Sequence, residues 1–188
     1  MILILLQSFL LLLTLSSGNI QHNYYWRDYK DIIPEDAING TADLYIGQVY
    51  YEGILAGTFY PTAKQVVTEC RGERRIIKYP IKILCDKRKD NFEWMYVNVK
   101  SLNAEKLSDM VVGGFEVNNT LYIGKIFHEG EWKIGRVFPP PYWLPGLTVW
   151  YNNGKQYITH DFQILRYLGK PEDRPPSHCE CKELVFNE

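Results

Sequence analysis

The sequence of 188 residues lacks the usual marks of an enzyme or of a nucleic-acid-binding protein. It has four histidines and contains no phosphate-binding glycine loop, no Gly-x-Ser-x-Gly elbow and no His-Glu-x-x-His motif. His160 and Asp161 come nearest to a base with an orienting acid, but neighbouring strand residues face opposite sides of a sheet. The formal net charge is −1, whereas nucleic-acid-binding domains are usually strongly basic. We therefore expect no catalysis, no cofactor and no nucleic-acid partner.

Long apolar runs are missing beyond residue 18. Residues 1–15 are almost wholly apolar and are followed by Ser-Ser-Gly, a pattern typical of a cleaved secretory signal over residues 1–18. This run is shorter than the roughly 20 residues that a membrane span requires. An uncleaved anchor is the alternative interpretation. The sequence thus predicts a secreted, extracellular protein without a membrane span.

Cysteine is scarce, with four residues at positions Cys70, Cys85, Cys179 and Cys181. An even number in an oxidising compartment favours disulfides, and three connectivities are open. Cys179 and Cys181 are badly spaced for a bond to each other, so we expect at least one of them to tie the C-terminal tail to Cys70 or Cys85. A metal site at His178, Cys179 and Cys181 is the alternative, but it needs a fourth ligand from elsewhere. We therefore predict no metal site.

The most informative feature present is a decapeptide that occurs twice. Residues 44–53 read LYIGQVYYEG and residues 121–130 read LYIGKIFHEG, so that six of ten positions are identical. The two copies are separated by 77 residues, from 121 − 44. Such self-similarity indicates two copies of one supersecondary unit, neither of which can bury its apolar face alone.

The pattern around each decapeptide is that of β-strands. Apolar and polar residues alternate within the decapeptides, and short strands ending at proline follow them. Two hairpins come next, at residues 65–77 and 147–158, and the second has an Asn-Gly sequence that favours a tight primed turn. One or two helical turns at residues 102–110 are the exception. We predict an all-β fold of antiparallel, sandwich-like sheets with repeats at residues 26–92 and 93–168, internal pseudo-twofold symmetry and an extended tail at residues 169–188.

Two N-glycosylation sequons precede the decapeptides, Asn39-Gly-Thr41 and Asn118-Asn-Thr120. Neither contains proline, so both asparagines are glycan acceptors if they are exposed. Their similar positions predict the same surface turn in each repeat.

The order of these motifs resembles that of tandem DM-nine repeat proteins. A Trp, an Ala-Ile-type pair, the Leu-Tyr-Ile-Gly strand, a Glu-Gly turn, a glycine-anchored strand and a closing Ile-Leu occur twice within residues 26–168. The resemblance implies two intertwined antiparallel sheets related by a pseudo-twofold axis. Some members of that family bind mannose-type sugars in invertebrate innate recognition.

The same resemblance implies where a sugar would bind. In the mannose-binding members an acidic residue before the Leu-Tyr strand and a Lys at the start of the next strand contact the sugar. These places fall on Glu116 and Arg136 in the second repeat, and on Asn39 and Thr58 in the first, where both charges are missing. The guanidinium of Arg is planar and presents its donors in fixed directions, so Arg is not equivalent to Lys. A surface salt bridge is the alternative role for Glu116 and Arg136.

The leading hypothesis is therefore a secreted, lectin-like protein that binds glycans or glycoproteins and works as a monomer or as a homodimer. A secreted salivary or venom-type effector that kept the scaffold and lost sugar binding is the alternative. An unrecognised hydrolase is the least favoured hypothesis.

Overall fold

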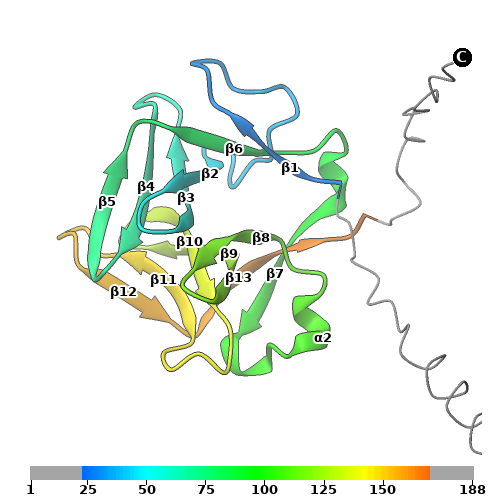
Figure 1. Ribbon diagram of the computed structural model, residues 1–188, viewed down its shortest axis with the longest axis vertical. Coiled ribbons are helices and arrows are strands. Elements are labelled where there is room, and N and C mark those ends of the chain that lie inside the picture. The colour runs from blue at the N-terminus through cyan, green and yellow to red at the C-terminus, as the bar shows by residue number, and fades with distance from the viewer. Residues whose placement is uncertain (1–22, 170–188) are drawn as a thin grey trace, which may run out of the picture.

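The structure is a computed structural model, and it describes residues 23–169. These residues form a thirteen-stranded antiparallel sheet (Figure 1). The strands of the first half are β1 (Tyr25–Asp28), β2 (Tyr45–Tyr50), β3 (Ile54–Tyr60), β4 (Gln65–Cys70), β5 (Glu73–Ile77) and β6 (Ile81–Cys85). Those of the second half are β7 (Phe92–Asn98), β8 (Val112–Glu116), β9 (Asn119–His128), β10 (Glu131–Phe138), β11 (Gly146–Trp150), β12 (Gln156–Thr159) and β13 (Asp161–Tyr167). The predicted all-β fold class is confirmed.

The strands pair in the same order in both halves of the chain. In the first half the order of neighbours is β1, β6, β2, β3, β4 and β5. In the second half it is β7, β13, β9, β10, β11 and β12. In Figure 1 the first half occupies mostly the upper part of the molecule and the second half mostly the lower part. The connection between the two halves comprises residues 86–91, because β6 ends at Cys85 and β7 begins at Phe92.

A glycine lies at the same place in each half because two backbones approach closely there. A Cβ atom on Gly57 would lie 2.4 Å from the carbonyl oxygen of Val67, and one on Gly135 would lie 2.2 Å from that of Thr148. Any side chain would push the neighbouring strand away. The glycine-anchored strand of the sequence pattern thus has a steric cause, and that cause is repeated with the fold.

The sheet curls back on itself so that β3 lies against β10. These two strands are separated by β8 and β9 in the sheet order. Nevertheless the Thr58 hydroxyl accepts a 2.7 Å hydrogen bond from the Ile134 amide and donates a 3.2 Å bond to the Ile134 carbonyl. Between the halves lies a shared core made of buried residues from both, namely Ile38, Ile46, Ala56, Leu84, Val111, Ile123, Ile134, Leu165 and Tyr167. Each half therefore buries its apolar face against the other.

Both predicted hairpins form, but the primed turn expected at the Asn-Gly sequence does not. Between β4 and β5, Arg71 and Gly72 both have positive φ angles of 55° and 81°, as a primed turn requires. In the Asn-Gly hairpin only Gly154 has a positive φ, of 86°. The backbone amide of Asn152 donates a 2.5 Å hydrogen bond to the Glu129 carboxylate, and this bond holds the loop in a different turn.

Helices are short in the described residues. They are η1 (Lys89–Asn91), η2 (Val99–Ser101) and α2 (Ala104–Leu107), and α2 lies within the predicted helical segment. Within residues 23–169 no helix has the length and apolar character needed to cross a membrane.

Candidate functional site

Arg136 occupies the centre of a buried ion network. It lies on β10, opposite Ile123 of β9 and Thr148 of β11. One terminal nitrogen donates a 2.6 Å hydrogen bond to Oε2 of Glu116, and the other donates a 2.6 Å bond to Oε2 of Glu69. The guanidinium thus bridges two carboxylates, each through one charge-assisted hydrogen bond.

The two carboxylates come from different halves of the chain. Glu116 ends β8 and its side chain is 28% exposed. Glu69 lies on β4, has no exposed surface, and accepts a second bond of 2.6 Å from the Gly72 amide. A buried charge is tolerated when it is paired and hydrogen-bonded, and Glu69 meets both conditions. The network therefore joins the two halves while leaving one carboxylate accessible.

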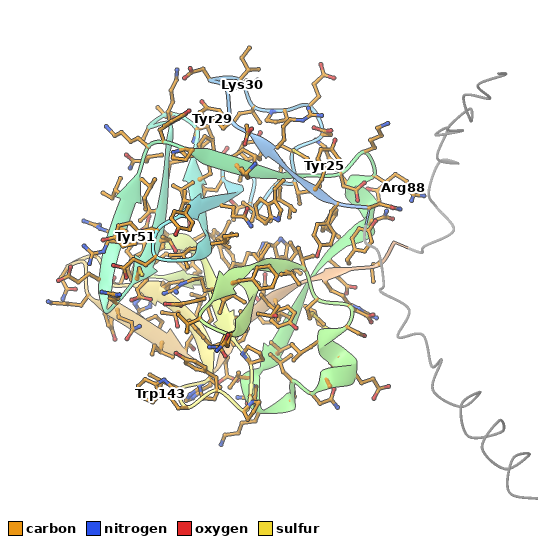
Figure 2. The ribbon with its side chains drawn as sticks, viewed as in Figure 1. Tyr25, Tyr29, Lys30, Tyr51, Arg88 and Trp143 are labelled. Carbon is orange, nitrogen blue, oxygen red and sulfur yellow. The ribbon has the colours of Figure 1, made fainter. Side chains whose placement is uncertain are left out.

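A cleft of about 170 Å³ opens above this network. The rings of Phe138 and Tyr142 stack on one side with centroids 4.6 Å apart. Trp143 is 80% exposed and projects at the edge of the molecule (Figure 2). The residues that line the cleft are Glu69, Arg71, Glu116, Arg136, Phe138, Tyr142, Trp143, Leu144, Thr148, Gln156 and Ile158. Charged groups at the floor and aromatic rings at the rim suit a polar ligand with an apolar face.

Comparison with known proteins places this arrangement in a family. A model of the DM9 repeat matches residues 38–141, which is more than half of the chain. The chain belongs to the DM9 repeat family. The resemblance inferred from the sequence motifs is thereby confirmed, although the match does not count the repeats.

The fold of this DM9 protein is similar to that of a solved structure. The crystal structure of the nematode sperm cell motility protein MFP2B superposes with a TM-score of 0.56 at 15% sequence identity. The match covers 79% of this chain and 47% of that chain, so this DM9 protein spans about half the length of its structural relative. At this identity the likeness shows the fold alone. No curated protein matches the sequence.

The structure brings Glu116 and Arg136 together, as the family resemblance implies. In the first half Thr58 takes the place of Arg136, since it lies opposite Ile46 as Arg136 lies opposite Ile123. Asn39 does not take the place of Glu116. Thr58 is completely buried and bonds to Ile134. Asn39 is exposed and pairs with Tyr45. Its counterpart in the second half is Val112, which pairs with Tyr122, and not Glu116.

The reason for this difference is the length of the connection. Six residues separate Asn39 from Tyr45, from 45 − 39, whereas ten separate Val112 from Tyr122, from 122 − 112. The four extra residues extend the second half as the β8–β9 hairpin, whose far end carries Glu116 and Asn118. The first half makes no such hairpin in the described chain, so it has no position equivalent to Glu116.

Glu69 is the residue of the site that the sequence analysis missed. The sequence does hold one signal for it: Glu69 is the charged residue of the otherwise apolar or neutral strand QVVTEC, in which five of six residues are buried. A charged side chain in a buried strand requires a partner of opposite charge. Its partner Arg136 is 67 residues away in the sequence. A comparison of the two repeats does not reveal Glu69, because its contact with Arg136 joins one repeat to the other.

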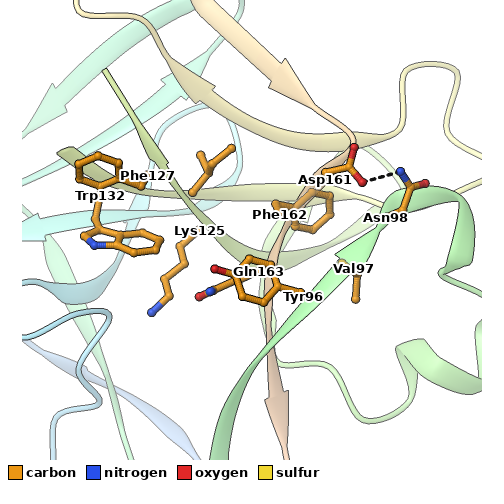
Figure 3. A pocket seen from close by; sticks show the side chains of 10 residues that line it. Tyr96, Val97, Asn98, Lys125, Phe127, Trp132, Asp161, Phe162 and Gln163 are labelled. Carbon is orange, nitrogen blue, oxygen red and sulfur yellow. Dashed lines mark hydrogen bonds between the residues drawn. The ribbon is translucent and has the colours of Figure 1, made fainter. Parts of the chain in front are cut away.

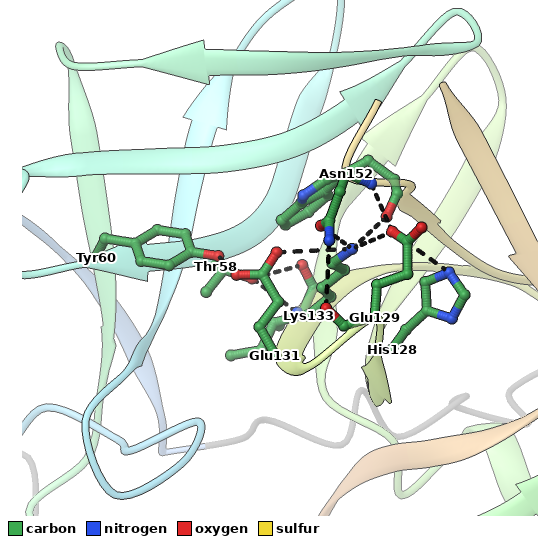
Figure 4. A network of polar contacts seen from close by, with 9 residues as sticks. Thr58, Tyr60, His128, Glu129, Glu131, Lys133 and Asn152 are labelled. Atoms are coloured by element: carbon green, nitrogen blue, oxygen red, sulfur yellow. Dashed lines mark hydrogen bonds and ion pairs between the residues drawn. The ribbon is translucent and has the colours of Figure 1, made fainter. Parts of the chain in front are cut away.

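A second buried cation, Lys133, lies near the opposite end of β10 (Figure 4). Its Nζ atom donates hydrogen bonds to the Trp150 carbonyl at 2.8 Å, to Oδ1 of Asn152 at 3.1 Å and to Glu129 at 3.2 Å. Glu131 lies 3.6 Å from the same atom. Burial of Glu129 opposes its ionisation, but the Asn152 amide and the Lys133 ammonium outweigh this and lower its pKa. All donors of Lys133 are engaged, so we assign this network to the fold.

Two of the four cysteines, Cys70 and Cys85, lie within the described residues. Cys70 and Cys85 are both free thiols and both are buried. Burial raises the pKa of each thiol, to about 12 for Cys85. Cys179, Cys181 and the alternative metal ligand His178 lie outside the described residues. Residues 23–169 contain no cluster of three or more His, Cys, Asp or Glu side chains that could hold a metal ion.

Both sequon asparagines are exposed. Asn118 lies in the β8–β9 turn with a φ of 64°, and Asn39 precedes the turn closed by the Gly40 amide and the Leu44 carbonyl. Asn118 thus lies within its turn and Asn39 lies just before a different one, so the two asparagines do not occupy equivalent positions.

Proposed function

We propose that this DM9 protein is a secreted carbohydrate-binding protein of the mannose type, which acts by recognition and not by catalysis. The observation that supports this most is the Arg136 guanidinium held between Glu69 and Glu116 beneath an open cleft. The family resemblance supplies the sugar class.

The chemistry of the cleft suits a sugar. The accessible oxygens of Glu116 can accept hydrogen bonds from two neighbouring hydroxyls, and charged acceptors make the stronger bonds. Arg136 fixes the position of this carboxylate and supplies the cationic side of the site. The exposed face of Trp143 offers an apolar surface to the C–H groups of a sugar ring.

Glu116→Gln tests the proposal because it removes the negative charge and keeps the shape. A hydrogen bond to a charged group contributes about 1.5–3 kcal/mol, so we expect mannose-type oligosaccharides to bind roughly 10- to 100-fold more weakly by titration calorimetry. Glu131→Gln is the matched control, because Glu131 is similarly exposed (38% against 28%) and also pairs with a buried cation.

Equal affinities of the wild-type protein and Glu116→Gln for these oligosaccharides would contradict this site.

A specific observation favours a second candidate function, that of an interaction protein without sugar binding. The cleft of about 170 Å³ is smaller than the roughly 300–1,000 Å³ of most ligand pockets, and both terminal nitrogens of Arg136 are already bonded. Failure of the wild-type protein to bind any mannose-type glycan would support that candidate.

Secretion is part of the proposal and has its own test. Expression of the full chain in a eukaryotic secretory cell should yield a protein in the medium that lacks residues 1–18. An N-glycosidase should reduce its mass if Asn39 or Asn118 carries a glycan. Retention of residues 1–18 in a cell-associated product would favour the anchor instead.

A further inference from the structure

A larger hollow lies away from the Arg136 cleft, on strands β7, β13, β9 and β10 (Figure 3). Its volume is about 500 Å³, which falls within the usual range for ligand pockets of roughly 300–1,000 Å³. Its lining includes Tyr96, Lys125, Phe127, Trp132, Asp161 and Gln163. We call it the Lys125 groove.

The strand register builds the groove from two rows of side chains. Tyr96, Gln163 and Lys125 lie side by side on three adjacent strands. In the next row the Asn98 amide donates a 2.7 Å hydrogen bond to Asp161. Figure 3 shows this pair at one side of the groove and the aromatic rings of β9 and β10 at the other.

The aromatic side is a pair of rings in contact. Phe127 and Trp132 lie opposite each other on β9 and β10, with centroids 5.6 Å apart in an edge-to-face arrangement. Phe127 is 58% exposed and Tyr96 is 78% exposed. Large exposed rings around a hollow are more informative than scattered ones, because a soluble surface rarely groups them without a binding role.

Lys125 is a buried cation whose ammonium lies over the rings of Trp94 and Trp132. Its residue is 9% exposed, and its Nζ atom lies 4.2 Å from the centroid of Trp94 and 5.1 Å from that of Trp132. It donates a 2.8 Å hydrogen bond to the Gly40 carbonyl, which uses one of its three donors. Among residues 23–169 no carboxylate lies within ion-pair distance of this atom. Burial lowers its pKa to about 8. Apart from the bond to Gly40, the Lys125 ammonium makes no hydrogen bond within residues 23–169.

The first half of the sheet provides an internal comparison. By register the places of Tyr96, Gln163 and Lys125 are taken there by Asp28, Lys82 and Gln48. Asp28 and Lys82 form an exposed ion pair of 2.7 Å. The same scaffold position thus carries an ordinary solvated surface in one half and an aromatic groove in the other, so the fold alone does not require the groove.

We propose that the Lys125 groove is a second carbohydrate-binding site, which takes an oligosaccharide. Sugar rings have an apolar C–H face, which suits the electron-rich faces of Tyr96 and Phe127. Their hydroxyls can bond to the Gln163 amide and to the free donors of Lys125. The groove extends the proposed carbohydrate binding to a different surface, and it does not need the Arg136 cleft to bind.

Titration calorimetry of the full chain with mannohexaose, cellohexaose and hexagalacturonate tests this site. We expect at least one of these probes to bind, and Tyr96→Ala to weaken its binding about 2- to 12-fold, since an aromatic contact contributes roughly 0.5–1.5 kcal/mol. Gln163→Ala should weaken the same probe. The matched control is Tyr79→Ala, because Tyr79 is 85% exposed and lies outside the groove. Both tyrosines are surface residues, so neither variant should lower the melting temperature appreciably.

The proposal is overturned if none of the three probes binds, or if Tyr96→Ala and Gln163→Ala bind as well as the wild type. Equal weakening by Tyr79→Ala would also overturn it. Glu116→Gln separates the two sites. Binding that is lost in Glu116→Gln and kept in Tyr96→Ala would support the Arg136 cleft and reject the groove, whereas the reverse result would support the groove alone.

Discussion

The Glu69 carboxylate and the Arg136 guanidinium form a 2.6 Å ion pair that joins the two halves of the sheet out of contact with solvent. Glu69 has no exposed surface, and the Arg136 side chain is 3% exposed. Removal of one partner of such a pair leaves the other buried without compensation, which costs more than the pair itself contributes.

Arg136→Met should therefore lower the free energy of unfolding by about 3–5 kcal/mol, measured by urea denaturation. The control is Arg166→Met. Arg166 also lies near two carboxylates, at 3.4 Å from Asp109 and 4.0 Å from Glu93, but its side chain is 36% exposed. Exposed pairs contribute about 0–1 kcal/mol, so this variant should lose little. Similar losses for both arginines would show that burial of Glu69 does not matter.

The glycines of the repeated strands provide a second test. Gly57→Ala and Gly135→Ala would each place a Cβ atom within 2.4 Å of a backbone carbonyl oxygen, which a strand cannot move aside without losing its ladder bonds. Overpacking costs about 1–3 kcal/mol or more, so both variants should unfold at a clearly lower urea concentration. Gly72→Asn is the control. Gly72 has open space around it and a φ of 81°, which Asn tolerates. Equal stability of all three variants would refute the steric role of Gly57 and Gly135.

Much of the fold could be predicted because its signals are local. The hairpin predicted at residues 65–77 is present as β4 and β5, which the Arg71-Gly72 turn connects. The Asn-Gly hairpin was predicted less well, since the Glu129 carboxylate, which is distant in sequence, binds the Asn152 amide. Local turn preference was overridden by a tertiary hydrogen bond.

The candidate sites depended more on contacts between distant residues. Glu116 and Arg136 could be found because the motif order of the family carries them. Glu69 could not, since its contact crosses from one repeat to the other. The surroundings of Lys125 were also hidden, because Trp94 reaches it through the pairing of β7 with β13 and of β13 with β9.

The two described thiols can be tested chemically. Both are buried and free, and burial raises the pKa of each, so iodoacetamide should not modify Cys70 or Cys85 in the native protein at pH 8. In guanidinium chloride without reductant, both should be alkylated, as read by peptide mass mapping. Protection of either cysteine in the unfolded, unreduced protein would reveal a disulfide to the C-terminal tail and would contradict the free thiols.

Lys125 should titrate at an unusually low pH. Its pKa in the folded protein is about 8, below the 10.5 of an ordinary lysine, because burial disfavours the ammonium. Between pH 8 and 10.5 the folded state has released this proton while the unfolded state keeps it, so this residue's contribution to stability rises with pH in that window. Below pH 8 the burial penalty is fully present.

In carbon-detected NMR the Lys125 Cε resonance should have a midpoint near pH 8, and Lys125→Met should lack the associated rise in unfolding free energy relative to wild type. The exposed Lys64 is the control in the same spectra, because its hydrogen bond to Asp31 raises its pKa. A common midpoint for both lysines would mean that the Lys125 ammonium is hydrated, and that the groove does not hold it among the rings of Trp94 and Trp132.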